Sequence, residues 1–156
     1  MTKTNVMRIL DAHGITYAAH EYDNSTTDGE TVARMIGKPA DSVFKTLVTE
    51  GSDRRHYVFV VPVCGTLDLK AAAHAAGVKS VAMIPQKNLL PLTGYIHGGC
   101  SPIGMKKPFP TFIDSTAKGK STIVVSAGKI GHQIEIAPTD LAEAAGAAFA
   151  PIASER

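Results

Sequence analysis

One lysine within an apolar segment could place a positive charge inside a binding pocket. Lys45 stands in the apolar run over residues 43–48. Side chains alternate between the two faces of a strand, so Lys45 shares a face with Val43 and Leu47. Thr46 lies on the opposite face. A lysine with apolar neighbours on its own face either guards an exposed sheet edge or places a cation in a pocket, and the pattern leaves both interpretations open.

A second segment is rich in glycine and small residues. It reads Gly98-Gly99-Cys100-Ser101-Pro102-Ile103-Gly104-Met105-Lys106-Lys107 and lies within residues 93–110, the longest stretch without a helix or strand pattern. Consecutive glycines allow backbone N–H groups to turn toward an anion or a developing oxyanion. Long irregular loops of this kind are more often functional than simple connections. We therefore interpret this segment as a functional loop.

Basic residues are concentrated in the middle of the chain. The net charge is only +2, but residues 79–129 hold seven lysines and a single acid, Asp114. The flanking segments, 1–78 and 130–156, have net charges of −1 and −3. Such a segment is a candidate surface for a polyanion, because neutralising phosphates releases counterions. A solvated basic face is the alternative.

Composition excludes several classes of protein. A length of 156 residues suits one domain, and 44% hydrophobic with 19% charged residues excludes intrinsic disorder. No apolar run reaches the roughly 20 residues of a membrane span, and no signal-peptide core follows Met1. Two cysteines, Cys64 and Cys100, cannot form a disulfide framework or a cysteine-based zinc site. We expect a reduced, cytoplasmic single domain over residues 1–156 with no metal and no cofactor.

Periodicity and turn residues predict a mixed α/β (α+β) chain. Several predicted strands follow one another directly, so a doubly wound parallel sheet is not expected. Capping residues and glycines bound the predicted helices. The predicted helices cover residues 4–13, 29–36, 69–76, 85–92 and 138–146, and the predicted strands cover 15–22, 43–49, 56–63, 80–84, 112–114, 122–126 and 133–137.

Four segments together resemble the YbaK/EbsC family, free-standing relatives of the editing domain inserted in bacterial prolyl-tRNA synthetases. They are the strand around Lys45, the stretch from Pro62 to Lys70, the Gly98–Lys107 loop, and Val125-Ser126-Ala127-Gly128-Lys129. The resemblance covers nearly the whole chain and is strongest to the Cys-tRNA(Pro) deacylase branch. It implies a partly closed mixed β-sheet or barrel surrounded by helices. It also implies hydrolysis of the ester between a wrong amino acid and tRNA(Pro). The implied partners are aminoacyl-tRNA(Pro) and prolyl-tRNA synthetase, with no DNA and no membrane.

The resemblance also assigns roles to residues. It places the family's functional lysine on Lys45, its substrate-loop glycine and proline on Gly98 and Pro102, and its pocket serine on Ser126. Two differences from the family pattern stand out: the loop after Tyr22 is short and lacks an aromatic pocket residue, and Gln133 stands where relatives often carry Asp. The predicted catalytic residues are Lys45, Gly98 and Ser126, and the predicted substrate-binding residues are Tyr22, Thr46, Gly99, Cys100, Ser101 and Pro102.

The resemblance suggests a mechanism without an enzyme nucleophile, since the sequence offers no catalytic triad, metal site or carboxylate pair. In this hypothesis the substrate's cysteine thiolate attacks its own ester and releases tRNA and a thiolactone. Lys45 would hold the terminal phosphate or the ester, N–H groups of the turn at 98–101 would face the oxyanion, and Ser126 would position the 3′ end or the α-amino group. The basic segment would meet the acceptor stem.

Two other functions stay open at this point. One is a deacylase that removes Ala or another small amino acid from tRNA(Pro). The other is a non-catalytic RNA-binding or regulatory module with the same fold. The basic segment supports RNA binding whether the chain is an enzyme or a binding module, whereas the combination of Lys45 with the Gly98–Pro102 loop favours catalysis.

Overall fold

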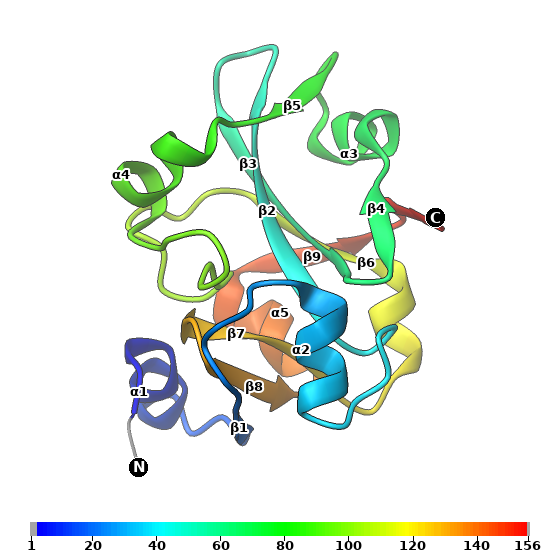
Figure 1. The fold of residues 1–156 in the computed structure, drawn as a ribbon. Helices are drawn as coiled ribbons and strands as arrows, with labels where there is room; N and C mark the ends of the chain where they lie inside the picture. The colour runs from blue at the N-terminus through cyan, green and yellow to red at the C-terminus, as the bar shows by residue number, and fades with distance from the viewer. Residues whose placement is uncertain (1–2, 156) are drawn as a thin grey trace.

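The computed structural model describes residues 3–155, so the predicted domain limits at Met1 and Arg156 lie outside the described residues. Figure 1 shows a single α/β body. Its helices are α1 (Asn5–Ala12), α2 (Gly29–Met35), α3 (Leu69–Ala76), α4 (Leu89–Thr93) and α5 (Pro138–Ala145), with 3-10 turns η1 (Gln86–Asn88) and η2 (Ser115–Gly119). Its strands are β1 (Ala18–Glu21), β2 (Phe44–Gly51), β3 (His56–Pro62), β4 (Gly65–Leu67), β5 (Val81–Met83), β6 (Thr111–Asp114), β7 (Ile123–Lys129), β8 (His132–Ile136), β9 (Ala147–Ala150) and β10 (Ala153–Glu155).

The strands form one mixed five-stranded sheet, one antiparallel three-stranded sheet and a two-stranded pair. The large sheet has the order β5-β2-β3-β6-β9, in which β6 runs parallel to both β3 and β9. The small sheet has the order β1-β8-β7, and β10 pairs with β4. A parallel bridge between Val43 and Val124 joins the two larger sheets at one corner. The predicted mixed α/β fold is therefore confirmed, and this bridge partly closes the sheets around the core.

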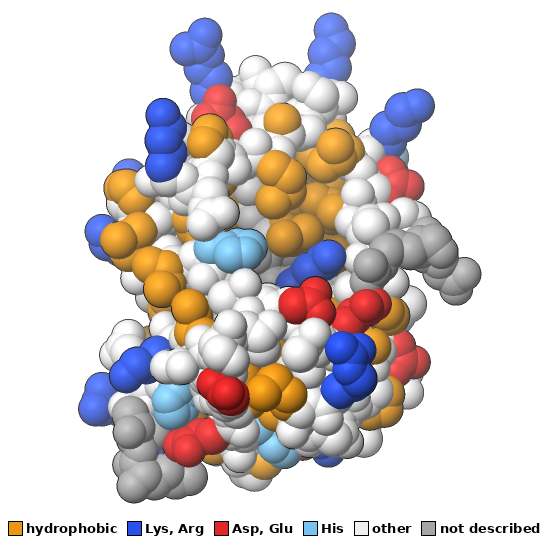
Figure 2. All heavy atoms as spheres, in the orientation of Figure 1, with side chains coloured by type: hydrophobic (Ala, Val, Ile, Leu, Met, Phe, Trp, Pro, Cys, Tyr) orange, Lys and Arg blue, Asp and Glu red, His pale blue; other side chains and the backbone are white. Residues whose placement is uncertain are grey.

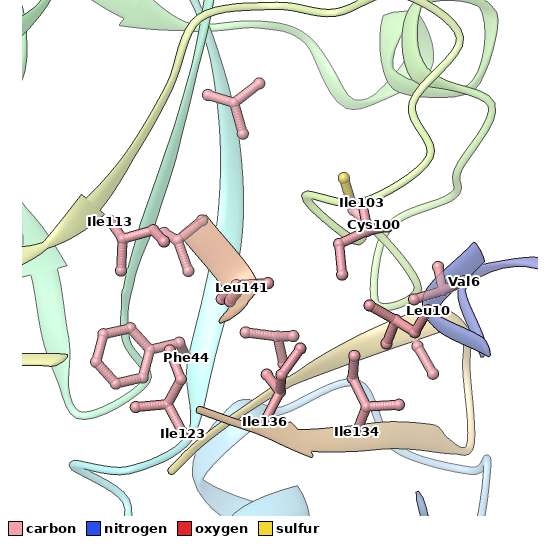
Figure 3. Close-up of a cluster of buried hydrophobic side chains, with 14 of the residues drawn as sticks. Val6, Leu10, Phe44, Cys100, Ile103, Ile113, Ile123, Ile134, Ile136 and Leu141 are labelled. Atoms are coloured by element: carbon pink, nitrogen blue, oxygen red, sulfur yellow. The ribbon is translucent and has the colours of Figure 1, made fainter. Parts of the chain in front are cut away.

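The main hydrophobic core fills the space between the two larger sheets. Figure 3 shows Phe44 from β2 packed beside Ile123 and Ile136 from the small sheet, with Leu141 of α5 nearby. Phe44 is only 2% exposed. Leu47, three residues further along β2, packs in a different cluster on the other side of the sheet. The alternation predicted for this strand is confirmed, and burying each large apolar side chain contributes about 1.5–3 kcal/mol.

Local sequence signals set the helix ends. Thr4, Asp28 and Asp68 cap α1, α2 and α3 by accepting hydrogen bonds from backbone N–H groups of the first turn. Gly77 follows α3 in the left-handed conformation that glycine adopts most easily. Within residues 3–155, no helix combines the length and apolar character needed to cross a bilayer.

The structure contains strands that the sequence pattern does not predict. They are β4 and, after the last predicted helix, β9 and β10. The alanine-rich β9 has no alternating pattern, and its parallel pairing with β6 depends on a contact distant in sequence. The carboxylate of Asp114 holds the segment between β9 and β10 by accepting from the N–H groups of Ile152 (3.0 Å) and Ala153 (2.9 Å). β1 covers Ala18–Glu21, whereas the sequence pattern predicts a strand over residues 15–22.

Glu135 on β8 ties three segments together. Its carboxylate accepts a hydrogen bond from the Thr122 hydroxyl (2.5 Å), contacts Nε2 of His20 on β1 (2.8 Å) and pairs with Lys38 after α2 (3.0 Å). The Thr122 and His20 hydrogen bonds, followed by the contacts with Lys38, lower the pKa of Glu135 to about 2 from its ordinary 4.5. Its side chain is 18% exposed, so water screens part of this interaction.

We expect Glu135→Gln to destabilise the fold at neutral pH by on the order of 2 kcal/mol. The pKa of Glu135 is lower in the folded than in the unfolded protein, so its stabilisation is fully present above about pH 4.5 and is lost as the pH falls toward 2. Urea unfolding at pH 7 and pH 3 measures this. The difference between wild type and variant should shrink at pH 3, and an equal difference at both pH values would contradict the assignment.

Candidate functional site

A cavity of about 290 Å³ opens between β2, the loop before α2 and the loop over residues 94–110. Figure 2 shows the molecule hollowed near the middle of this face, with a Lys or Arg side chain and a histidine on opposite sides of the hollow. The small sheet contributes one wall through β7 and β8. The cavity brings together six of the nine predicted site residues, namely Tyr22, Lys45, Thr46, Gly98, Cys100 and Ser126.

Lys45 lies in the wall of the cavity. It pairs with Val61 of β3 in the register of the large sheet and is half-buried. Val43 and Leu47, its neighbours on the same face, line the cavity with it. Of the two interpretations of this lysine, the structure supports a cation placed in a pocket.

Two buried hydroxyl groups at this cavity have no hydrogen-bond partner in the described part of the protein. Among the described residues, the Tyr22 hydroxyl and Oγ1 of Thr46 have no hydrogen-bond partner. Both residues line the cavity. A buried hydroxyl left unpaired costs about 1–3 kcal/mol, so polar groups of this kind mark a place where a ligand can bind. The predicted positions of Tyr22 and Thr46 at the site agree with this geometry.

Gly98 allows two loops to meet at the cavity. Its φ is +86°, and a Cβ added there would lie 2.4 Å from Cγ2 of Thr27, in the loop before α2. Only glycine satisfies both the backbone conformation and the close approach.

The wall formed by β7 and β8 contains Ser126, which is 8% exposed and whose Oγ accepts a hydrogen bond from Gly128 N–H (3.1 Å). Gln133 pairs with Ser126 across β7 and β8 and is also buried in the wall.

The remaining predicted residues do not line this cavity. The N–H group of Gly99 already donates to the Ile96 carbonyl (3.0 Å), so it does not face an oxyanion. Ser101 is fully buried, and its Oγ accepts from Ile103 N–H (3.3 Å). Pro102 borders a separate cavity. The structure thus gives Gly99, Ser101 and Pro102 a part in shaping the loop, and their contact with substrate stays a prediction.

The ionisable groups of the cavity differ in what they can do. Burial raises the pKa of the Cys100 thiol to about 12, so Cys100 remains protonated at neutral pH. Asp28 accepts hydrogen bonds from the N–H (3.1 Å) and hydroxyl (2.6 Å) of Thr31 as a helix cap. Asp28 and His97 both line the cavity, and neither is among the site residues predicted from the sequence. Within residues 3–155, no group of three or more His, Cys, Asp or Glu side chains is placed to hold a metal ion.

We expect Gly98→Ala to destabilise the protein by about 2–4 kcal/mol, because it combines backbone strain with a clash. Gly77→Ala is the matched control: Gly77 has a φ of +73° but no atom within 4 Å of the added Cβ, so it should cost only about 1 kcal/mol. Adding Thr27→Gly to Gly98→Ala should recover part of the loss. Thermal or urea unfolding measures all three variants, and equal costs at positions 98 and 77 would contradict the packing argument.

Comparisons with known proteins agree with this geometry. The family model of the aminoacyl-tRNA editing domain matches residues 23–144. The chain is 44% identical over 155 residues to a protein of Enterococcus faecalis, EbsC, which carries the provisional name Cys-tRNA(Pro)/Cys-tRNA(Cys) deacylase. The match covers 98% of this chain and 94% of EbsC.

Two crystal structures share the fold. The hypothetical protein APE2540 has a TM-score of 0.89 at 22% identity, with 97% of this chain and all of that chain covered. A protein provisionally described as a trans-editing enzyme for prolyl tRNA synthetase has a TM-score of 0.83 at 23% identity, with 98% and 99% covered. The family model and the EbsC match span most of the chain, including the cavity. The chain therefore belongs to the aminoacyl-tRNA editing domain family.

Proposed function

We propose that this chain is a trans-editing hydrolase that deacylates mischarged Cys-tRNA(Pro). The observation that carries the proposal is Lys45 in the wall of a cavity that the Gly98 loop closes, a cation beside a space suited to an aminoacyl-adenosine end. Membership of the editing family and the name of the 44% identical relative support the same reaction. Recognition of tRNA(Pro), action alongside prolyl-tRNA synthetase and a cytoplasmic location belong to this proposal.

The cavity supplies placement and electrostatics, and the substrate supplies the nucleophile. The substrate thiol loses its proton, its sulfur bonds to the ester carbon, and the bond from that carbon to the ribose oxygen breaks. The ribose oxygen takes up a proton, which leaves tRNA and a thiolactone that water opens to cysteine. Lys45 stabilises the negative charge on the terminal phosphate or on the ester oxygen. Charge stabilisation and fixed orientation of the reacting groups can each lower the activation barrier by several kcal/mol.

Polar groups around the cavity hold the rest of the substrate. The unpaired hydroxyls of Tyr22 and Thr46 can donate to the ester or the ribose, and Ser126 lines the same cavity from β7. Gly98 lets its loop pack against Thr27, which closes this part of the cavity around the bound end of the substrate. These groups act through hydrogen bonds and need no covalent enzyme intermediate.

Deacylation of a panel of charged tRNAs tests the proposal. We expect Cys-tRNA(Pro) to be hydrolysed roughly a hundredfold faster than Ser-tRNA or Ala-tRNA(Pro), because a hydroxyl is a poor nucleophile here and alanine has none. Lys45→Ala should lower kcat/KM by about 10²–10³-fold with an unchanged circular dichroism spectrum, whereas Lys70→Ala on α3 should retain activity. Equal rates on Cys- and Ala-tRNA(Pro), or full activity of Lys45→Ala, would contradict the proposal. Cys-tRNA(Cys) in the panel separates selection of the amino acid from selection of the tRNA.

We expect the double variant Cys64→Ala/Cys100→Ala to keep deacylating Cys-tRNA(Pro) at a rate within a few-fold of wild type. The reason is that Cys100 stays protonated, so it is a poor nucleophile. The rate is measured together with the Tm, because Cys100 is buried and its truncation removes packing. Loss of turnover in a variant that remains folded would instead point to an enzyme thiol.

A further inference from the structure

The loop that joins β2 to β3 carries two adjacent arginines that the cavity does not use. Arg54 and Arg55 are both exposed at the end of this hairpin. Arg54 has a φ of +67° and is the only non-glycine residue with a positive φ in the described part of the chain. A hairpin position of this conformation usually holds Gly or Asn, since an ordinary side chain is strained there. The sequence thus keeps a cation at the tip at some cost in stability.

The surrounding contacts hold this loop in one shape. Arg54 N–H donates to the Gly51 carbonyl (2.9 Å), and Gly51 N–H donates to the Arg55 carbonyl (2.8 Å). The carboxylate of Asp53 accepts from the Tyr57 hydroxyl (2.6 Å) and from Arg55 N–H (3.0 Å). A Cβ at Gly51 would lie 2.6 Å from that carboxylate, so glycine leaves the space in which Asp53 makes these two hydrogen bonds. The two guanidinium groups therefore project from a preorganised turn.

Further cations stand beside the two arginines. Ser52 N–H donates to the Ser80 carbonyl (2.9 Å), which fixes the loop against the residue that follows exposed Lys79. Figure 2 shows Lys and Arg side chains projecting at the top of the molecule, over the β2–β3 loop and β5 of Figure 1. Two acids lie nearby. Asp53 accepts a hydrogen bond within the turn, and Glu50 pairs with His56 (3.5 Å). This group of Arg54, Arg55 and Lys79 is called the basic tip.

Arg54 and Arg55 of the basic tip lie on the same hairpin as Lys45. Lys45 and Gly51 are six residues apart on β2, which corresponds to roughly 20 Å along an extended strand. The tip is therefore too far from the cavity to touch the terminal nucleotide. It lies at a distance suited to phosphates further along an RNA whose 3′ end occupies the cavity.

We propose that the basic tip docks the phosphate backbone of the acceptor end of the tRNA while the aminoacyl end occupies the cavity. This inference rests on the proposed function and adds the surface that holds the rest of the substrate. Phosphate contacts of this kind position the RNA without reading its sequence. Arginines suit them because a guanidinium binds a phosphate through two hydrogen bonds.

Binding of uncharged tRNA tests the proposal directly. By fluorescence anisotropy over a range of salt concentrations, Arg54→Glu should raise Kd about three- to tenfold and lower the salt slope by about 1. Arg8→Glu, an equal charge change on α1 at the other end of the molecule in Figure 1, should leave Kd within twofold. Arg54→Gly should weaken binding while its Tm stays the same or rises, because glycine removes the strain. Unchanged Kd and salt slope in both Arg54 variants would overturn the proposal.

Kinetics on two substrates separate this proposal from the proposed function. Arg54→Glu should raise KM for Cys-tRNA(Pro) and leave kcat unchanged, and it should not affect hydrolysis of a cysteinyl ester on a short 3′-terminal oligonucleotide. A wild-type protein that hydrolyses neither substrate would contradict the proposed function, while the tRNA Kd still decides the role of the basic tip. Loss of binding to prolyl-tRNA synthetase with unchanged tRNA affinity would assign the tip to a protein partner and overturn the proposal.

Discussion

The position of the Lys45 ammonium group depends on the burial of its neighbours in β2. Lys45 is half-buried, so its ammonium group gives up part of its hydration, and the burial of neighbouring side chains helps to hold the strand in this place. Phe44 and Val48 supply them, because each is 2% exposed in the core between the two sheets. A shift of β2 by one residue would turn Lys45 to the other face of the sheet, and the same shift would bring these apolar side chains to the wrong face. The core therefore fixes the site.

The cavity contains groups that can position a substrate, and it lacks a strong enzyme nucleophile among the described residues. Cys100 is protonated and Asp28 caps a helix, so neither is available as a nucleophile or a base in the way that a catalytic triad requires. What the cavity provides is a cation and unpaired hydroxyls in fixed positions. A reaction within a single bound substrate gains most from such fixed geometry, since orientation replaces a bimolecular encounter. Under the proposed mechanism, a substrate with its own thiol reacts much faster than one without it.

The sequence predicted those parts of the fold and site that depend on local patterns. Alternation placed Lys45 and Leu47 on one face of β2, and capping residues placed the starts of α2 and α3. β9 and β10 could not be predicted, because they form through pairing with strands distant in the chain. The same reason applies to His97 and to the packing of Gly98 on Thr27, which only the meeting of two loops reveals. Pro102 was selected by resemblance and Ser101 as part of the predicted oxyanion turn, whereas neither residue lines the cavity.

A single hairpin connects the chemistry to the rest of the substrate. Its cavity half carries Lys45 and its far end carries Arg54 and Arg55 of the basic tip, so in the proposed complex one hairpin sets the distance between the ester and the bound backbone. Backbone contacts of this kind attract any tRNA and weaken as salt is added, and they contribute no sequence preference. Selection by this chain must then come from the cavity, through the chemistry of the attached amino acid. An editing enzyme built in this way needs no base-reading element of its own, and preference for one tRNA is left to whatever delivers the charged tRNA to the cavity.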